Sequence, residues 1–499
     1  MNTSQIAPAA DSATATSPVN VRGYDDLPGP RGLPFFGNAL QLDAPRLHLQ
    51  LEQWSREFGP LYKLKLPGRN LLVVSNHEMV AAVLRDRPDG FSRSKRLEEI
   101  WTELGLPVGV FVANGDVWKR QRRIVMAGFD PAHVKRYYPA MVAVSQRLSA
   151  RWRHAATDSR TIDLQADLMR YTVDTIAGLA FGAQVDTLSS DGDVIQQHLD
   201  QIFPALWQRM FKPVPLWRWL PSAADKRLAH SIKQVNHAVD GFIAQARARL
   251  AAEPKRREAP PNLLEAMIVA ADEPDSGIDD QQVAGNVMTM LLAGEDTTAN
   301  TLAWMLYLLW QNPPTLARAN EEVQRVVGDN NSPSLEQMAQ LEYVEACAHE
   351  AMRLKPVAPI IGAQAQREVM IGDVLIPAGV IVSTVMRADS VSNVHIPNAV
   401  AFEPERWLTD RGTATSAATT ANSAKRISMP FGAGPRICPG RYLALLEIKL
   451  AIATILRDFD ITSVGTNDGG PAQELMKFAM APVGLRMRLR AKAREAAIH

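Results

Sequence analysis

Two hydrophobic patterns alternate along this chain. Apolar residues recur every three or four positions over several long segments, which predicts amphipathic or buried helices. These predicted helices span residues 141–155, 163–181, 232–252, 281–311, 314–327, 341–354 and 440–457. Short apolar runs predict strands at 61–66, 70–75 and 380–386, with Pro67-Gly68 turning between the first two. We therefore expect a mainly α-helical protein with a small β lobe built from both ends of the chain.

Composition and charge exclude several classes of protein. The 499 residues are 46% hydrophobic, enough for a sizeable core, and the net charge of +1 gives no reason to expect a nucleic-acid partner. Two cysteines exclude a disulfide framework and fit a reducing, cytoplasmic location. The start of the chain lacks a signal peptide, and two acids interrupt the apolar run 283–310, so no membrane anchor is expected.

Candidate chemistry begins with the second cysteine. Cys438 lies between a glycine-rich loop and the predicted helix 440–457, so a thiolate there would face the first N–H groups of that helix. Arg436 could bind a carboxylate through two hydrogen bonds. Gly432 and Gly440 would let a flat cofactor approach the backbone closely. A buried structural cysteine is the ordinary alternative.

The predicted helix 281–311 breaks its apolar character at Ala293-Gly-Glu-Asp-Thr-Thr298. A glycine, two acids and two threonines in mid-helix cost helix stability, and a threonine hydroxyl can bond to the carbonyl four residues earlier and bend the helix. A tolerated kink with exposed acids is one interpretation. A buried Asp-Thr pair with a chemical purpose is the other, and the apolar flanks on both sides favour it.

Two further charged motifs are weak signals by themselves. Trp118 and Arg122 are four residues apart and therefore share a helix face. Glu350 and Arg353 form an i, i+3 pair, and Arg406 follows some fifty residues later. Each motif is common by chance, so it becomes informative only when the other motifs occur in the same chain.

Together with the pattern Phe431, Gly434, Arg436, Cys438 and Gly440, these motifs make the chain similar to the cytochrome P-450 family. The resemblance covers residues 27–490 as a single large domain with that family's fold. It leaves residues 1–26 as a disordered N-terminal tail and 491–499 as a C-terminal tail. The Ala/Thr/Ser-rich run 409–423 is expected to be a flexible surface insertion.

The resemblance implies a haem whose iron is bound by Cys438, with Phe431 shielding the sulfur. Arg436, Trp118 and Arg122 would hold haem propionates. Many relatives carry an arginine in the segment 354–366 that binds a propionate, but this chain has none there. The sequence does not indicate which residue makes that contact instead. Glu350, Arg353 and Arg406 would form a structural network.

By the same resemblance, the polar break is an oxygen-activation motif. It comprises Ala293, Gly294, Asp296 and Thr297, with a groove for O2 beside Gly294. Thr297 would donate a hydrogen bond to the activated oxygen, and Asp296 would relay protons from water. The implied substrate is a small apolar molecule. Its pocket is expected to be lined by Val110, Phe111, Thr289, Ala293, Ala358, Ile360, Phe478 and Ala479.

The expected reaction is insertion of one oxygen atom from O2 into a C–H or C=C bond by a haem-thiolate monooxygenase. Because the chain ends 61 residues after Cys438, electrons would come from a separate ferredoxin or flavodoxin and its reductase. Lys119, Arg120, Arg123 and Arg441 are candidate docking cations, although a solvated basic face explains them equally well, and we expect a monomer. The alternatives are a peroxygenase or haem-thiolate isomerase on the same fold, or a non-enzymatic haem gas sensor.

Overall fold

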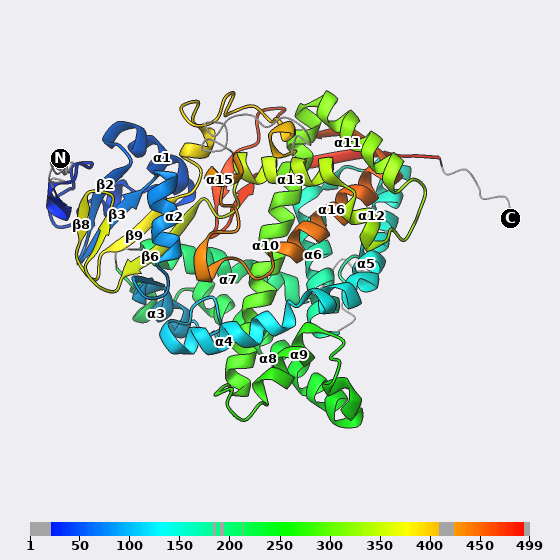
Figure 1. The fold of residues 1–499 in the computed structure, drawn as a ribbon, viewed down its shortest axis with the longest axis horizontal. Helices are drawn as coiled ribbons and strands as arrows, with labels where there is room; N and C mark the ends of the chain where they lie inside the picture. The colour runs from blue at the N-terminus through cyan, green and yellow to red at the C-terminus, as the bar shows by residue number, and fades with distance from the viewer. Residues whose placement is uncertain (1–20, 183–185, 190–193, 213, 409–423, 494–499) are drawn as a thin grey trace, which may run out of the picture.

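Helices dominate the structure, a computed structural model that describes residues 21–182, 186–189, 194–212, 214–408 and 424–493. The helices are α1 Leu47–Phe58, α2 His77–Arg85, α3 Lys95–Glu103, α4 Gly115–Gly128, α5 Pro131–Thr157, α6 Leu164–Phe181, α7 Val194–Phe211, α8 Ala223–Ala252, α9 Leu263–Ala271, α10 Asp280–Gln311, α11 Pro313–Val326, α12 Leu335–Ala339, α13 Glu342–Leu354, α15 Ala424–Ile427 and α16 Arg441–Asp458. Figure 1 shows α10 running through the middle of the molecule.

The β lobe lies at one end of the molecule, beside the start of the described chain (Figure 1). The strands are β1 Arg22–Gly23, β2 Leu61–Leu66, β3 Arg69–Val74, β4 Phe91–Ser92, β5 Ile162–Asp163, β6 Ile360–Ala365, β7 Val369–Ile371, β8 Val374–Ile376, β9 Ile381–Val385, β10 Phe459–Gly465, β11 Glu474–Met476, β12 Met480–Pro482 and β13 Arg486–Ala491. The largest sheet has the order β2-β3-β9-β6-β4. It therefore joins strands from both ends of the chain, as predicted.

The mainly α fold with a small β lobe is confirmed, and each predicted helix and strand has a counterpart. The largest difference concerns residues 200–220, which the sequence indicates as an aromatic, loop-rich segment whose rings pack in the core. Most of this segment belongs to helix α7, which accommodates Pro204 in its interior. Proline and bulky aromatic residues lower helix propensity, but packing against α8 overrides it.

The folded region begins earlier than the expected tail boundary. Arg22–Gly23 pairs with β8, and Tyr24 is buried with its hydroxyl donating to the carbonyls of Leu64 and Leu71. At the other end, Lys492 donates to Asn320 and to the Leu456 carbonyl. The rest of the two expected tails, and the expected insertion 409–423, lie outside the described residues.

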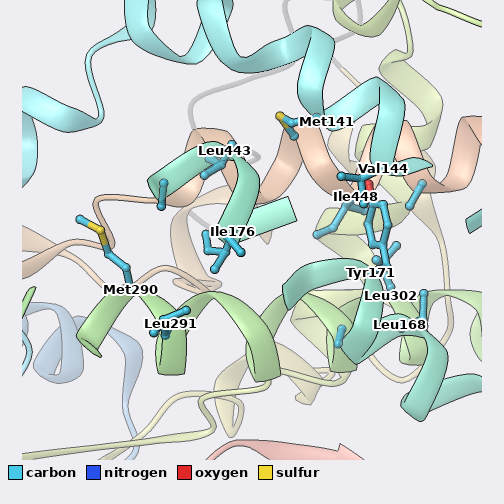
Figure 2. Packing of buried hydrophobic residues seen from close by; sticks show 14 of the residues in the cluster. Met141, Val144, Leu168, Tyr171, Ile176, Met290, Leu291, Leu302, Leu443 and Ile448 are labelled. Carbon is cyan, nitrogen blue, oxygen red and sulfur yellow. The ribbon is translucent and has the colours of Figure 1, made fainter. Parts of the chain in front are cut away.

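The main core lies where four long helices meet. Figure 2 shows apolar side chains of α5, α6, α10 and α16 converging, among them Val144, Tyr171, Leu302 and Ile448. Burial of such side chains contributes about 1.5–3 kcal/mol each. Across the described ranges, no helix combines the length and apolar character needed to cross a membrane.

Candidate functional site

The loop before α16 is fixed by close backbone contacts. Gly434 has φ +71°, and a Cβ there would approach the Arg85 Cα and the Leu84 carbonyl oxygen to 2.6 Å. A side chain at this position would therefore collide with α2. The Cys438 N–H donates to the Phe431 carbonyl at 3.0 Å, which folds the loop back on itself.

The Cys438 thiol sits directly before the first turn of α16. Burial raises its pKa, while the Gly440 N–H and the charges of Arg122 and Arg441 favour the thiolate. The sequence pattern alone indicates a lowered pKa for this thiol, because it precedes a helix. In the structure, burial raises the pKa by more than the start of α16 lowers it. A bound metal ion removes the proton from a coordinating thiol outright, so the three favourable groups would then stabilise the charged ligand.

Four arginines lie close to this loop: Arg436 and Arg122, described here, and Arg87 and Arg93, described next. The Arg436 guanidinium lies 4.6 Å from the Trp118 ring centroid and donates to the Ala113 carbonyl at 2.6 Å. Arg122, one turn after Trp118 on α4, donates to the Ile437 carbonyl at 2.7 Å. The structure thus brings together Trp118, Arg122 and Arg436, as predicted.

Arg87 and Arg93 were missed in the sequence and complete this cluster. Burial lowers the pKa of Arg87 to about 10, and burial together with the charges of Arg87 and Arg436 lowers the pKa of Arg93 well below its usual value. None of the four arginines forms an ion pair with an acid in the described part of the chain. Their membership of this cluster becomes visible only in the folded structure, because the sequence does not show which arginines are buried without an acidic neighbour.

A haem fits this arrangement. Each haem carries two propionates, and a half-buried group of unpaired guanidiniums is the environment that would stabilise them. The Nε atom of Arg436 is buried and has no hydrogen-bond partner among the described residues. Arg87 and Arg93 therefore supply positive charge that the segment 354–366 lacks.

The polar break of α10 opens onto solvent-accessible space in an otherwise buried helix. Ala293 is exposed, whereas Met288–Leu292 and Thr298–Leu306 are buried. Gly294 faces α6, and the expected O2 groove beside it stays a prediction. A Cβ there would meet Ile176 of α6 at 2.7 Å, so the missing side chain allows α6 and α10 to pack closely.

Thr297 and Asp296 are both held by hydrogen bonds. The Thr297 hydroxyl donates to the Ala293 carbonyl at 2.7 Å, the i−4 bond that the sequence predicts. In this arrangement its lone pairs remain free, so Thr297 offers an acceptor where we expected a donor. Asn300 donates to Asp296 Oδ1 at 2.5 Å and accepts from Gln165 at 3.0 Å, forming an amide chain that leads from the carboxyl group to α6.

Three acids with raised pKa values lie around this break. Burial raises the pKa of Asp296 to about 6, although Asn300 and Lys477 oppose the shift. Desolvation and the charge of Asp296 raise the pKa of Asp200 on α7 to about 6. Burial and both neighbouring acids raise the pKa of Glu295 well above its usual value. Near neutral pH, this group can therefore hold and release protons.

We expect Asp296→Asn to stabilise the protein at pH 7.5 by about 1–3 kcal/mol. The folded-state pKa of Asp296 is raised from 3.8 to about 6, so its contribution to stability is most favourable below pH 3.8 and is lost as the pH rises through 6. The advantage of the variant should shrink as the pH falls from 6 toward 4. Urea unfolding at several pH values measures this difference.

Asp116→Asn is the matched control for this experiment. The Asp116 side chain is 82% exposed on α4, and its change should stay within about 0.5 kcal/mol at every pH. A variant at Asp296 that is destabilised at pH 7.5 would contradict the raised pKa.

The Glu350 network has the predicted members and one more. Glu350 is fully buried and accepts from Arg353 at 2.7 and 2.8 Å and from Arg406 at 2.9 Å. Trp407 Nε1 donates to it at 2.8 Å. Arg353 also donates to the carbonyls of Ser390, Ala399 and Ala401. The network thus ties α13 to the segment 390–407.

Several of the predicted pocket residues come together around Phe478. The rings of Phe111 and Phe478 are 5.8 Å apart, and Phe203 of α7, one of the aromatic residues of the segment 200–220, stacks on Phe478 at 4.6 Å. Phe478 has φ +99°, a strained conformation for a bulky residue, of the kind that concentrates at functional sites. Ile360 packs into the same apolar cluster.

The other predicted pocket residues flank this group. The Val110 N–H donates to Asn286 of α10 at 2.7 Å, and the Thr289 hydroxyl donates to the Gly285 carbonyl at 2.8 Å. The Met480 N–H donates to the Val357 carbonyl at 2.7 Å, which links the segment of Ala358 to that of Ala479.

One predicted docking cation is placed differently from expectation. Lys119, Arg123 and Arg441 are exposed. Arg120 is half-buried, with its Nε atom enclosed and its side chain against Gly277. Arg120 is therefore less exposed than the other three predicted docking cations.

Comparisons with known proteins agree with this geometry. The family model described as Cytochrome P-450 matches residues 27–489. The crystal structure of a cytochrome P-450DA haem domain superposes with a TM-score of 0.78 and 25% identity, covering 94% of this chain and 98% of that one.

Similar curated sequences come from plants, fungi and a nematode. The protein LUTEIN DEFICIENT 5 of Arabidopsis thaliana is 28% identical over 81% of this chain and 67% of its own length. Carotene epsilon-monooxygenase of the same plant is 28% identical over 84% of this chain and 77% of its own. A self-sufficient cytochrome P-450 monooxygenase of Phanerodontia chrysosporium is 28% identical over 87% of this chain but only 40% of its own length. Both plant proteins are named as chloroplastic, so the cytoplasmic location stays a prediction.

Proposed function

Since the chain belongs to the cytochrome P-450 family and is a haem-thiolate monooxygenase, we propose that it inserts one oxygen atom from O2 into a C–H or C=C bond of an apolar small molecule. The observation that carries this proposal is the polar break of α10, where Asp296 and Thr297 accompany an exposed Ala293 within a buried helix. Such a break is suited to holding a proton and delivering it into the site.

Cys438 would bind the haem iron through its sulfur atom. Arg436, Arg122 and Arg93 would bind the propionates, and Trp118 would keep Arg436 in position through their cation–π contact. Gly432 and Gly440 would leave room beside the loop, and Phe431 would cover the sulfur. When bound, the haem supplies the reductive activation of dioxygen, and the protein supplies binding, orientation and protons.

Proton delivery would run through Asp296. Its pKa of about 6 allows it to take a proton from water and release it near neutral pH. Asn300 fixes one carboxyl oxygen, while Thr297 keeps its own proton on the Ala293 carbonyl and presents lone pairs. Thr297 would thus orient the water or oxygen species that receives the proton.

The substrate would lie against the aromatic group formed by Phe111, Phe203 and Phe478. This group is apolar, so it would bind and exclude water from a hydrophobic substrate. Electrons would come from a separate ferredoxin or flavodoxin with its reductase. That proposal is supported by three exposed cations that could contact an acidic partner protein: Lys119, Arg123 and Arg441.

We expect Thr297→Ala to uncouple electron consumption from product formation. Haem content should remain intact, while the fraction of electrons that appears in product falls about tenfold and hydrogen peroxide rises, because the oriented acceptor is lost. The measurement compares reductant consumed, product and peroxide with a ferredoxin system.

Thr301→Ala provides the control, because Thr301 makes the same i−4 hydrogen bond, to the Thr297 carbonyl at 2.8 Å. Tight coupling in the Thr297 variant would remove Thr297 from the mechanism. Product formed with hydrogen peroxide but with no electron donor would instead favour a peroxygenase.

A further inference from the structure

Two histidines and an aspartate meet where α2 approaches the segment that follows β9. His77 is the first residue of α2, which lies against the β lobe (Figure 1), and Asp389 is 312 positions further along the chain. His395 comes from the turn just after Asp389. One ligand atom from each of the three side chains lies within 4.8 Å of the other two. The fold thus builds a compact group of metal-ligating side chains from distant parts of the sequence.

Asp389 lies between the two imidazoles. Its Oδ2 atom is 2.7 Å from His77 Nδ1, and its Oδ1 atom is 3.5 Å from His395 Nε2. The two imidazole rings meet edge to face, with centroids 5.1 Å apart. In the described part of the chain, Asp389 forms ion pairs with these two histidines and with no lysine or arginine. Its negative charge is therefore available to balance a bound cation.

The backbone around the group is fixed by hydrogen bonds. The His77 N–H donates to Asp389 Oδ2 at 2.8 Å, and the Asn76 side chain caps the same end of α2. The His395 N–H donates to the Ser392 carbonyl at 3.0 Å, which closes the turn that carries this imidazole. Because the ligands are already held close together, little conformational freedom remains to be lost on binding.

The spacing suits a zinc ion. Zinc binds imidazole nitrogen and carboxylate oxygen at about 2.0–2.2 Å, so two of its tetrahedral ligands lie about 3.3 Å apart. The two Asp–His separations, 2.7 and 3.5 Å, lie on either side of that value. The side chains of His77, Asp389 and His395 are 12%, 18% and 24% exposed, so an ion can reach them from solvent and is then largely enclosed.

We propose that His77, Asp389 and His395 bind a zinc ion, with water in the fourth position. His77 would bind through Nδ1 and carry its proton on Nε2, and His395 would bind through Nε2. Imidazole ligands suit zinc, whereas magnesium and calcium prefer oxygen ligands, so the donor set selects a transition-metal cation. The ordinary alternative is a His–Asp–His cluster held by hydrogen bonds alone.

The zinc ion would act as a cross-link within the fold. It would tie the first turn of α2 to the segment 389–395, and the far end of α2, at Arg85, contacts the Gly434 loop that carries Cys438. The two ends of α2 are separated by about 12 Å, so the zinc ion would lie apart from the thiol ligand. The inference does not depend on the proposed function.

Calorimetric titration of the untagged, haem-loaded protein with zinc chloride tests the proposal, after removal of divalent cations. We expect one saturable site with a Kd of about 1 µM or below and at least about 100-fold weaker binding of magnesium. His395→Ala and Asp389→Asn should each weaken zinc binding by more than about 10-fold. The asparagine keeps an oxygen that can accept from the His77 N–H, so the Asp389 variant should remain folded.

His154→Ala is the matched control. His154 is exposed on α5 and lies outside the group, so its removal should leave the affinity for zinc unchanged. X-ray absorption at the zinc edge gives a second measurement, which the haem iron does not disturb. It should show nitrogen and oxygen neighbours at about 2.0–2.2 Å and no sulfur neighbour at about 2.3 Å.

Equally tight zinc binding by the wild type and His395→Ala would overturn the inference, because the ion would then lie elsewhere on the protein. A sulfur neighbour or the lack of a saturable site in the wild type would also overturn it. All these results leave the haem spectrum untouched. A protein without the spectrum of a haem thiolate would instead overturn the proposed function, so the two failures are distinguishable.

Discussion

Cys438→Ser is expected to abolish the red-shifted Soret band of the ferrous carbon-monoxide complex and to reduce monooxygenation by more than about 100-fold. Losing partners of a metal ligand costs about 10- to 100-fold, so losing the ligand itself should exceed that range. Serine is a poor replacement because its hydroxyl gives the iron far less electron density than a thiolate. The absorption spectrum of the reduced protein under carbon monoxide measures the effect directly.

Cys347→Ser is the natural control, because the chain has only these two cysteines. Cys347 is fully buried on α13, and burial raises its pKa well above its usual value, so it is an inert packing residue. This variant should keep the red-shifted band and lose only some stability. A Cys438→Ser protein that retained the band would show that another residue binds the iron.

The second large effect concerns stability. Glu350→Gln should lower the free energy of unfolding by about 3–5 kcal/mol, because it leaves Arg353 and Arg406 without their shared carboxylate inside the protein. Arg353 is 1% exposed, so water cannot replace the lost partner. Urea unfolding of the haem-loaded variant, followed by tryptophan fluorescence, gives the difference.

The pH dependence of this effect has a definite sign. Hydrogen bonds and the charge of Arg353 lower the pKa of Glu350 below 4.5. Its contribution to stability is therefore fully present above pH 4.5 and is lost as the pH falls through the lower, folded-state value. The difference in the free energy of unfolding between wild type and variant should therefore narrow as the pH falls below 4.5.

Glu403→Gln tests whether burial is the cause. Glu403 pairs with Arg406 at 2.9 Å, but its side chain is 42% exposed, so its loss should cost no more than about 1 kcal/mol. An equal loss of unfolding free energy in the Glu350 and Glu403 variants would mean that the buried carboxylate contributes no more to stability than the exposed one.

Motifs that are local in sequence were predictable from their own residues, whereas the long-range contacts of Arg436 with Trp118 and of Arg406 with Glu350 were expected only through the family resemblance. The Cys438 loop and the Thr297 hydrogen bond to Ala293 follow from residues within a few positions of one another, so the sequence is enough. Arg93 meets Arg436 only in the folded protein, and the absence of a neighbouring acid has no counterpart in a linear pattern.

Gly294 and Arg120 illustrate the same limit. The sequence does not show that the missing side chain of Gly294 lets Ile176 of a different helix pack against it. Arg120 belongs to a basic run that reads as solvent-facing, but the turn at Gly277 covers it. Both features depend on which segment of the chain lies alongside, and hydrophobic periodicity does not encode that information.

The pairing of β3 with β9 has a consequence for how the protein is made. Val74 lies opposite Thr384, about 310 residues later. At about 5–20 residues per second, a ribosome needs roughly 15–60 s to synthesise the missing partner strand. During that interval the β2–β3 hairpin presents an unpaired edge, so the nascent chain is exposed to faulty association until most of its length has emerged.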